Sequence, residues 1–315
     1  MAGIMEGVDA RTQMVGANRL ELLLFHLGAN QRYGINVFKV QEVIQCPPLT
    51  NMPNSASAVR GIVNMRGKTL SIIDLGMAMG KMPVADPSTG YVIITEFNRK
   101  VQGMLVSGVD RILNMNWKDI MPPPNGMGKN TYMTAVTKVD NELIEIIDVE
   151  KVLSEIVGQN TEVSADVLAQ SDSEEGAKYH ILVVDDSSVA RNQVKRTLEQ
   201  LGIEVILCND GFEALSKLKA MALEHGDVTK SISMIISDVE MPEMDGYTLT
   251  AEIRKDPMLK DVYVALHTSL SGVFNKTMVE KVGADQFLPK FHPDELAKMV
   301  LEALKNEKVH PIVML

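Results

Sequence analysis

The stretch HILVVDDSSVAR, residues 180–191, decides how the second half of this chain folds. Ile181–Val184 is an uninterrupted apolar run, which is typical of a strand buried on both faces of a parallel sheet. Asp185 and Asp186 follow the run directly, and the residues after them carry apolar side chains at helical spacing. The stretch therefore predicts a buried strand, an acidic strand end and a helix.

The same alternation of strand and helix continues to the end of the chain. It predicts strands at Ile203–Leu207, Met234–Ser237, Val262–Leu266 and Gln286–Leu288, and helices at Ala214–Ala222, Tyr247–Ile253, Val273–Val282 and from Pro293 onward. Five strands and five helices in strict alternation indicate a doubly wound α/β domain with a five-stranded parallel sheet. Ligands of such domains bind at the C-terminal ends of the strands.

Polar residues of one coherent chemistry follow these strand ends. Asp185 and Asp186 follow the first strand, Asp238 the third, Thr268 the fourth and Lys290 the fifth. Three carboxylates at one sheet edge repel one another, so we expect a divalent cation, Mg²⁺, among them. With the cation bound, one carboxylate can attack a phosphoryl group. The threonine hydroxyl can then donate to a phosphoryl oxygen, and the lysine ammonium can pair with its charge.

Each of these residues also has a structural interpretation. Asp186 could cap the helix that starts near Ser188, Asp238 could be an ordinary loop acid, Thr268 a strand residue and Lys290 a solvated cation. Taken singly, those interpretations are favoured; five residues of matching chemistry at four strand ends favour the phosphoryl site. An Asp-nucleophile phosphohydrolase would use similar groups, but such hydrolases usually place the nucleophile after the first strand of their domain, and here it follows the third.

Four segments of this half resemble the response-regulator receiver family: HILVVDDSSVAR, MIISDVEMPEMDGYTL (234–249), ALHTSLSG (265–272) and ADQFLPK (284–290). The resemblance extends from Tyr179 to about Lys305 and implies a role for each matching residue. Asp238 is the implied phosphoacceptor, Asp186 and Asp238 the side-chain ligands of Mg²⁺, Glu240 a main-chain ligand, Asp185 the companion acid, Thr268 the hydroxyl switch, Phe287 the aromatic switch and Lys290 the phosphate-sensing lysine.

The first half of the chain has a different texture. Between Arg19 and Asp148, short runs rich in Val and Ile, such as YVIITEF and ELIEIID, are separated by Gly, Pro and Asn. Many short strands with few helical patterns predict sheets or barrels, and Val149–Val157 predicts a closing helix. The polar segment 158–178 that follows predicts a linker. This half has no phosphate-binding glycine loop, nucleophile elbow or His/Cys pair.

Four stretches of this half, taken in order, resemble the CheW family of chemotaxis coupling domains: YGINVFKVQEVI (33–44), VRGIVNMRGKTLSIIDL (59–75), VQGMLVSGVDRIL (101–113) and LIEIIDVEKVL (143–153). The resemblance implies two small five-stranded β-barrels and binding without chemistry. The implied partners are the histidine kinase CheA, the cytoplasmic tips of chemoreceptors and other CheW-like proteins. On this pattern Glu42 and Arg66 lie at partner contacts; the structural alternative is that Arg66 occupies a turn before Gly67 and Glu42 a solvated strand face.

The composition excludes several other classes. The chain has 315 residues, 45% of them apolar and 23% charged, which suits two globular domains at about 100–200 residues each. A net charge of −10 without a local basic patch disfavours a nucleic-acid function, and no apolar run approaches the roughly 18–20 residues of a membrane span. Cys46 and Cys208 stand in no metal or disulfide pattern, so we expect two buried thiols.

The two halves together resemble the CheV-type coupling proteins, in which a CheW-like domain is fused to a receiver. We expect a tail at residues 1–17, a CheW-like domain at 18–157, a linker at 158–178 and a receiver at 179–315. The expected function is a non-enzymatic, phosphorylation-regulated scaffold in the cytoplasm, beside membrane-bound chemoreceptor arrays and without inserting into the membrane. A receiver that acts mainly as a phosphate sink and an Asp-nucleophile phosphohydrolase stay open as alternatives.

Overall fold

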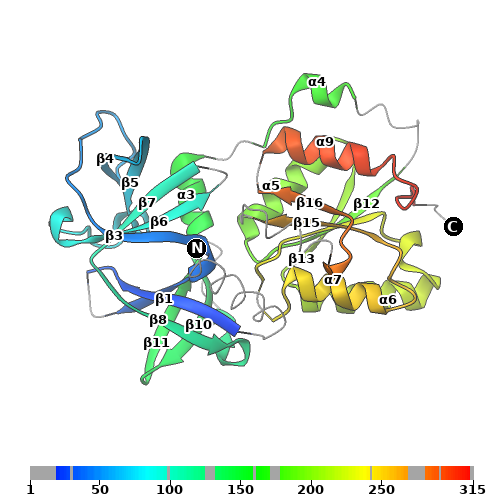
Figure 1. Cartoon of the computed structure of the whole chain (residues 1–315), viewed down its shortest axis with the longest axis horizontal. Helices are drawn as coiled ribbons and strands as arrows, with labels where there is room; N and C mark the ends of the chain where they lie inside the picture. Colours follow the sequence, from blue (N-terminus) through cyan, green and yellow to red (C-terminus); the bar gives the residue numbers. More distant parts are fainter. Residues whose placement is uncertain are drawn as a thin grey trace, which may run out of the picture. The chain divides into compact units, whose positions relative to one another are not determined.

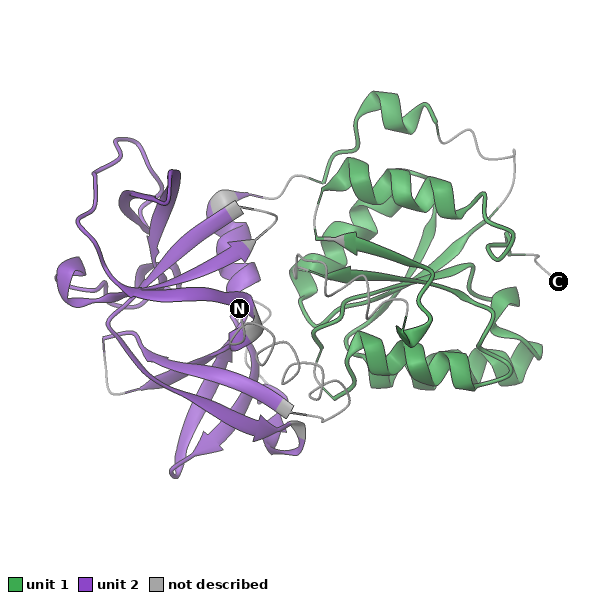
Figure 2. Cartoon of the chain, viewed as in Figure 1, with its two compact units in different colours: residues 1–18, 160–315 green, residues 19–159 purple. Residues whose placement is uncertain are grey.

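The computed structural model describes residues 19–28, 31–97, 100–124, 132–158, 161–170, 178–241, 243–268, 281–290 and 292–312. The chain divides between Gln159 and Asn160 into two compact units, which Figure 2 shows in purple and green. We call residues 19–159 the β-rich unit and residues 160–315 the α/β unit.

The β-rich unit is built from two sheets (Figure 1). The first has the order β8-β1-β2-β11-β10-β9 and consists of β1 (Arg19–His26), β2 (Arg32–Asn36), β8 (Gly108–Asn116), the two-residue β9 (Ile120–Met121), β10 (Met133–Val139) and β11 (Glu142–Ile147). The second has the order β3-β6-β7-β5-β4 and consists of β3 (Val40–Gln45), β4 (Val59–Met65), β5 (Lys68–Asp74), β6 (Tyr91–Phe97) and β7 (Lys100–Val106). Each sheet buries its own apolar cluster, with Leu22, Leu24 and Ile144 in the first and Ile72, Val92 and Leu105 in the second.

Short helices complete this unit: α2 (Leu75–Ala78), α3 (Val149–Val157) and the 3₁₀ turns η1 (Val37–Lys39), η2 (Pro87–Thr89) and η3 (Trp117–Asp119). The bounds of α3 are those that the sequence predicts. Its start is fixed by Asp148, whose carboxylate accepts a hydrogen bond from Lys151 N at 3.0 Å. Its end is fixed by Gly158, which adopts a φ of 78°.

The α/β unit contains the predicted five-stranded parallel sheet, and its strand order is β13-β12-β14-β15-β16. The strands of this sheet are β12 (His180–Val184), β13 (Glu204–Cys208), β14 (Met234–Ser237), β15 (Tyr263–Thr268) and β16 (Gln286–Pro289). The helices of the unit are α4 (Ala165–Leu168), α5 (Ser188–Glu199), α6 (Gly211–His225), α7 (Gly246–Lys255) and α9 (Pro293–Ala303), and η4 at Val228–Lys230 is a 3₁₀ turn. The helix predicted at Val273–Val282 lies outside the described residues except for its last two.

Alternating side chains of the strands build two cores on opposite faces of this sheet. Ile181 and Val183 pack with α5 and α9, whereas Leu182 and Val184 pack with α6 and α7. Figure 1 shows these two pairs of helices on either side of the sheet. The strands are thus buried on both faces, which explains their uninterrupted apolar sequences.

Helix α6 is longer than its apolar pattern predicts. It begins at Gly211 because the Asp210 carboxylate caps it, accepting from Glu213 N at 2.8 Å. The Glu213 carboxylate accepts in turn from Asn209 N at 2.9 Å, an arrangement close to a capping box. Gly226, with a φ of 79°, ends the helix after His225.

Both cysteines are buried free thiols, as predicted. Cys208 ends β13, and burial raises the pKa of its thiol to about 11. A thiol that stays protonated in an apolar core is unreactive, so neither the sequence pattern nor the burial indicates redox chemistry for Cys208.

Candidate functional site

The predicted acidic residues lie together at the C-terminal edge of the parallel sheet. Asp185 and Asp186 follow β12 and Asp238 follows β14, while Thr268 is the last residue of β15 and Lys290 follows β16. Parallel pairing brings these strand ends side by side, with Val184 opposite Ser237 and Thr268 opposite Pro289.

Lys290 connects the two buried carboxylates of this cluster. Its Nζ lies 2.7 Å from Asp185 Oδ2 and 2.9 Å from Asp238 Oδ2. The lysine side chain is 7% exposed and each carboxylate side chain 3%, so all three groups have left bulk water. The backbone supports this geometry, because Lys290 N donates to Thr268 O at 2.8 Å. Lysine, aspartates and the end of β15 therefore form one polar cluster.

Asp238 is held in an environment that disfavours its charge. Burial is the main reason that its pKa lies well above the usual value, and the neighbouring Asp185, Asp186 and Glu240 raise it further. The ammonium of Lys290 acts in the opposite direction and lowers the pKa. A carboxylate in this position is already largely desolvated before it reacts. It needs additional positive charge nearby to stay ionised.

Backbone groups fix the orientation of the two aspartates. Val239 N donates to Asp238 Oδ1 at 2.7 Å, and Ser187 N donates to Asp185 Oδ1 at 2.8 Å. Gly246 closes the loop behind the phosphoacceptor candidate, since a Cβ at this position would lie 2.1 Å from Asp238 O. Glycine is required there because no side chain fits between the start of α7 and the Asp238 backbone.

The donor set fits a magnesium ion. Asp185, Asp186 and Asp238 each offer a carboxylate oxygen, and these atoms lie within 4.8 Å of one another. Two oxygens bound to one Mg²⁺ at about 2.1 Å are at most about 4.2 Å apart, so small side-chain adjustments bring the cluster to binding distance. Glu240 follows two residues after Asp238 in the same loop and is half-buried. Hard oxygen ligands with a surplus of negative charge are what this cation prefers.

The β-rich unit brings its two predicted contact residues together. Arg66 Nη2 lies 3.1 Å from Glu42 Oε1 and 3.0 Å from Oε2, and the arginine side chain is 79% exposed. Arg66 and Gly67 form the two-residue turn between β4 and β5, with φ values of 50° and 77°. This type of hairpin turn favours Asn or Gly at its first position, so an arginine there adopts an unfavourable left-handed conformation. The turn presents a charged side chain at a cost in backbone energy.

Two known domain families match this chain. Residues 21–157 match the CheW-like domain, and residues 181–301 match the response regulator receiver domain. The chain is 32% identical over 280 residues to the chemotaxis protein CheV3 of Helicobacter pylori, covering 86% of this chain and 88% of that protein. It is 27% identical to CheV1 of the same organism, covering 97% of this chain and 99% of that protein. The chain belongs to the CheV family.

Both units of this CheV-family chain therefore have the fold classes that the sequence predicts, and the chain is a chemotaxis coupling scaffold that carries a receiver domain. The predicted strand number differs in one sheet of the β-rich unit, which has six strands among the described residues instead of five because the two-residue β9 pairs with β10. The crystal structure of the scaffolding protein TtCheW from Thermoanaerobacter tengcongensis is a solved relative, 27% identical, covering 42% of this chain and 87% of that chain at a TM-score of 0.39. CheW-like and receiver domains are adaptor-type modules, and receiver domains generally bind Mg²⁺ in their acidic pocket.

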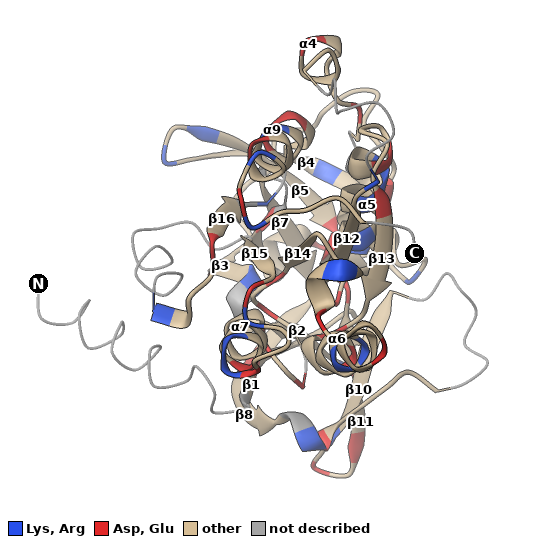
Figure 3. Ribbon diagram, turned by 90° about the vertical axis from the view of Figure 1, so that its right-hand side faces the viewer, with Lys and Arg blue, Asp and Glu red and all other residues tan. Residues whose placement is uncertain are grey.

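Several helices of this CheV-family chain carry mixed charge, and all of the described ones are short. Helices α6 and α7 of the α/β unit each carry both acidic and basic residues (Figure 3). Within the described ranges, no helix is long and apolar enough to cross a membrane.

Thr268 and Phe287 lie on the neighbouring strands β15 and β16. Thr268 is fully buried at the end of β15. Phe287 is half-buried on β16 and packs with an apolar group that includes Val239, Tyr247 and Leu266. Because Val239 directly follows Asp238, this apolar group leads from the candidate phosphoacceptor to the aromatic side chain.

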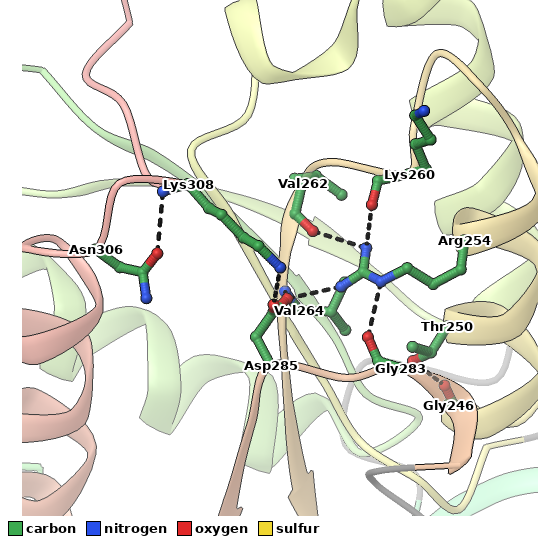
Figure 4. Close-up of polar contacts among 10 residues, drawn as sticks. All are labelled: Gly246, Thr250, Arg254, Lys260, Val262, Val264, Gly283, Asp285, Asn306 and Lys308. Carbon is green, nitrogen blue, oxygen red and sulfur yellow. Dashed lines mark hydrogen bonds and ion pairs between the residues drawn. The ribbon is translucent and has the colours of Figure 1, made fainter.

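A second polar centre of the α/β unit was not predicted from the sequence (Figure 4). The Arg254 guanidinium, at the end of α7, donates to Gly283 O at 2.7 Å, Lys260 O at 2.9 Å and Val262 O at 2.8 Å, and it pairs with Asp285 Oδ2 at 2.6 Å. Asp285 also accepts from Val264 N at 2.9 Å.

This centre joins the starts of β15 and β16, so it fixes the strands whose far ends carry Thr268 and Lys290. A lone arginine in the last turn of a helix is typical of a solvated residue, and no sequence signal distinguishes Arg254 from one.

Proposed function

We propose that this chain is a phosphorylation-regulated scaffold that couples chemoreceptors to the histidine kinase CheA in the cytoplasm, with Asp238 as the phosphoryl acceptor. The observation that supports the proposal most is the position of Lys290, whose ammonium contacts Asp185 and Asp238 at 2.7 and 2.9 Å in a buried, acid-rich strand edge. The chain accepts a phosphoryl group but does not turn over a substrate.

The Asp238 carboxylate attacks the phosphorus of a phosphohistidine on the kinase. A P–O bond to Asp238 forms while the P–N bond breaks, and the released imidazole takes up a proton. The Lys290 ammonium, which contacts Asp238 at rest, is within reach of a phosphoryl oxygen after transfer, and the Thr268 hydroxyl donates to a second one.

Magnesium suits this site as a cofactor. Asp186 and Asp238 would hold it through their side chains and Glu240 through its main-chain carbonyl, and when bound it neutralises charge on the carboxylates and the phosphoryl oxygens. Asp185 is the companion acid, placed by its ion pair with Lys290. The raised pKa of Asp238 supports a need for such neutralisation, because the carboxylate is buried beside other acids.

Phosphorylation changes the α/β unit through Thr268 and Phe287. The acyl phosphate carries roughly 1.5 to 2 negative charges where the carboxylate carried one, and its oxygens draw the Thr268 hydroxyl and the Lys290 ammonium toward it. Phe287 then turns into the space that the moving threonine leaves. The shared apolar group of Phe287, Leu266 and Val239 supports this coupling, since a shift of the Asp238 loop reaches the aromatic ring through direct packing.

The β-rich unit supplies the partner contacts. Glu42 and Arg66 form an exposed pair on the β3 strand and the β4–β5 turn, and we assign them to binding CheA, chemoreceptor tips or another CheW-like domain. The unfavourable φ of Arg66 supports a functional role, because a strained backbone persists where the side chain is needed.

Phosphoryl labelling tests the acceptor assignment. Acetyl phosphate or phosphorylated kinase with Mg²⁺ should give an acid-stable, base-labile label on the full chain, and Asp238→Asn should abolish it. Asp245→Asn is the matched control, because it alters an acid that caps α7 with a residue that also caps well.

Three outcomes bear on the assignment. A label on the control alone supports Asp238. An undiminished label on Asp238→Asn contradicts it. Sustained hydrolysis of a phosphate ester would instead indicate a phosphohydrolase.

A further inference from the structure

Residues 161–170, which the composition predicts as part of a linker, lie against the α/β unit; we call them the docked segment. Its backbone is held by side chains of two helices. Val163 N donates to Gln200 Oε1 at 3.0 Å, Gln200 Nε2 donates to Thr161 O at 2.6 Å, and Ser164 N donates to Asp294 Oδ1 at 2.8 Å. Gln200 follows α5 and Asp294 lies in the first turn of α9, so the segment bridges these helices.

Apolar contacts hold the docked segment as well. Val163 and Val167 are 6% and 2% exposed and belong to the same apolar core as Val194, Leu198 and Val300 of α5 and α9. Val167 belongs to α4, which forms a single turn beside α9 (Figure 1). A helix of four residues has no stability of its own in water, so α4 exists because the segment is docked. Release of the segment therefore unfolds α4.

Two polar side chains of α5 are buried. Gln193 and Thr197 lie on one stripe of α5, and Gln200 continues that stripe just past the end of the helix. Among the described residues, Gln193 Nε2 and Thr197 Oγ1 have no hydrogen-bond partner, which is unfavourable for a buried polar group. The segment itself is held by three hydrogen bonds, and each hydrogen bond contributes only a small net stabilisation. The docked segment is therefore held by few polar contacts, each of them individually weak.

One anchor of the segment is close in sequence to the phosphoryl site. Asp294 is four residues after Lys290, and His292 between them is extended and caps α9 without a side-chain hydrogen bond. A movement of Lys290 toward a phosphoryl group on Asp238 would begin only four residues before this anchor in the sequence. Among the hydrogen bonds described above, Asp294 is the charged side chain that holds the backbone of the docked segment.

We propose that the docked segment is a releasable strap: it holds the α5–α9 face at rest and leaves it when Asp238 is phosphorylated, which lengthens the tether between the two units. This inference rests on the proposed function of Asp238. While the segment is docked, residues 158–160 alone connect it to the end of α3; after release, residues 158–178 connect α3 to the rest of the α/β unit. For flexible chains of 3 and 21 residues the expected spans are about 10 Å and about 25 Å. Phosphorylation would then change how far the receiver can move from the coupling unit.

Hydrogen exchange on the full chain tests the strap. The exchange of the Val163 and Ser164 amides is followed by mass spectrometry with Mg²⁺, with and without beryllofluoride, and ¹⁹F NMR reports occupancy of Asp238 by the fluoride complex. We expect exchange of these two amides to become at least about tenfold faster at full occupancy, corresponding to about 1.4 kcal/mol. The Asp238→Ala variant should show no change. Full occupancy with unchanged or slower exchange overturns the strap and leaves the phosphoacceptor assignment intact.

The resting contact is tested without any phosphoryl mimic. Gln200→Ala removes both of its hydrogen bonds to the segment and should speed exchange of the Val163 amide in the resting chain. Asn192→Ala is the matched control, because Asn192 is exposed on α5 and, among the described residues, its side chain donates to Ser188 O within the same helix. Equal exchange in the two variants contradicts docking through Gln200. Absence of the ¹⁹F signal in the wild-type chain contradicts the proposed function itself, and the strap with it.

Discussion

Replacing Lys290 by methionine tests whether the buried cluster depends on its single cation. Lys290→Met keeps the length of the side chain but leaves Asp185 and Asp238 buried, both at 3% side-chain exposure, without the ammonium that contacts them. Breaking a buried ion pair from one side costs about 3–5 kcal/mol. Lys308→Met is the matched control: Lys308 also pairs with an aspartate, Asp285, at 2.6 Å, but it is 56% exposed, and such pairs contribute about 0–1 kcal/mol.

Native-state hydrogen exchange of the metal-free full chain measures this difference. The amides of β12 and β14, at the centre of the sheet, report the opening free energy of the α/β unit. In Lys290→Met they should exchange roughly 150- to 5,000-fold faster than in the wild-type chain at neutral pH.

The effect should also depend on pH. Removing the ammonium raises the pKa of Asp238 further, so acidification protonates this carboxyl and reduces the loss. A loss no larger than that of Lys308→Met, or one that does not shrink in acid, would refute the reasoning.

Three further changes test the site and the coupling surface. The pKa of Asp238 is raised in the folded chain, so its carboxyl stabilises the metal-free protein below about pH 4, and this stabilisation is lost as the pH rises through the raised pKa. Asp238→Asn should therefore flatten that part of the calorimetric curve of stability against pH. An unchanged slope contradicts the assignment. Gly246→Ala places Cβ 2.1 Å from Asp238 O and should reduce phosphoryl labelling. In the control Gly202→Ala, Cβ meets nothing within 4 Å, so this variant should lose only about 1–2 kcal/mol of stability for its φ of 74° and keep the label. Equal labelling of both variants contradicts the close approach. Arg66→Glu should weaken co-sedimentation with receptor–kinase assemblies at an unchanged melting temperature. Adding Glu42→Arg restores an ion pair between the two positions but should not restore binding. Recovery of binding in the double variant would mean that the two residues pair with each other and do not contact the partner.

The acidic edge of the sheet could be predicted from the sequence because two simple rules act together there. An uninterrupted apolar run such as Ile181–Val184 identifies a central parallel strand, and parallel strands place their C-terminal ends side by side. Asp185 and Asp238 follow two such neighbouring strands, and Lys290 follows the edge strand β16 of the same sheet, so topology alone places all three at one edge. The distances and the direct ion pairs with Lys290 depend on side-chain packing, which the sequence does not specify.

The docked segment and the Arg254 centre could not be predicted for a different reason. Val163 and Val167 are four residues apart in a polar stretch, which is too weak a pattern to distinguish a docked turn from a linker. Arg254 finds three carbonyl partners that come from two separate segments, and backbone carbonyls leave no trace in the sequence. In contrast, the start of α6 could have been placed from Asp210 and Glu213, since an acid followed three residues later by Glu is a capping pattern.

The central claim is that a phosphoryl group on Asp238 changes how the chain engages receptor–kinase arrays. The most direct measurement is co-sedimentation of the full chain with assembled arrays and Mg²⁺, with and without beryllofluoride, alongside Asp238→Ala and Thr268→Ala. We predict that beryllofluoride changes the bound fraction of the wild-type chain, has no effect on Asp238→Ala and has a blunted effect on Thr268→Ala, which still takes up the fluoride complex. Identical binding of the fully occupied and unoccupied wild-type chain would contradict the account and leave the receiver as a phosphate sink.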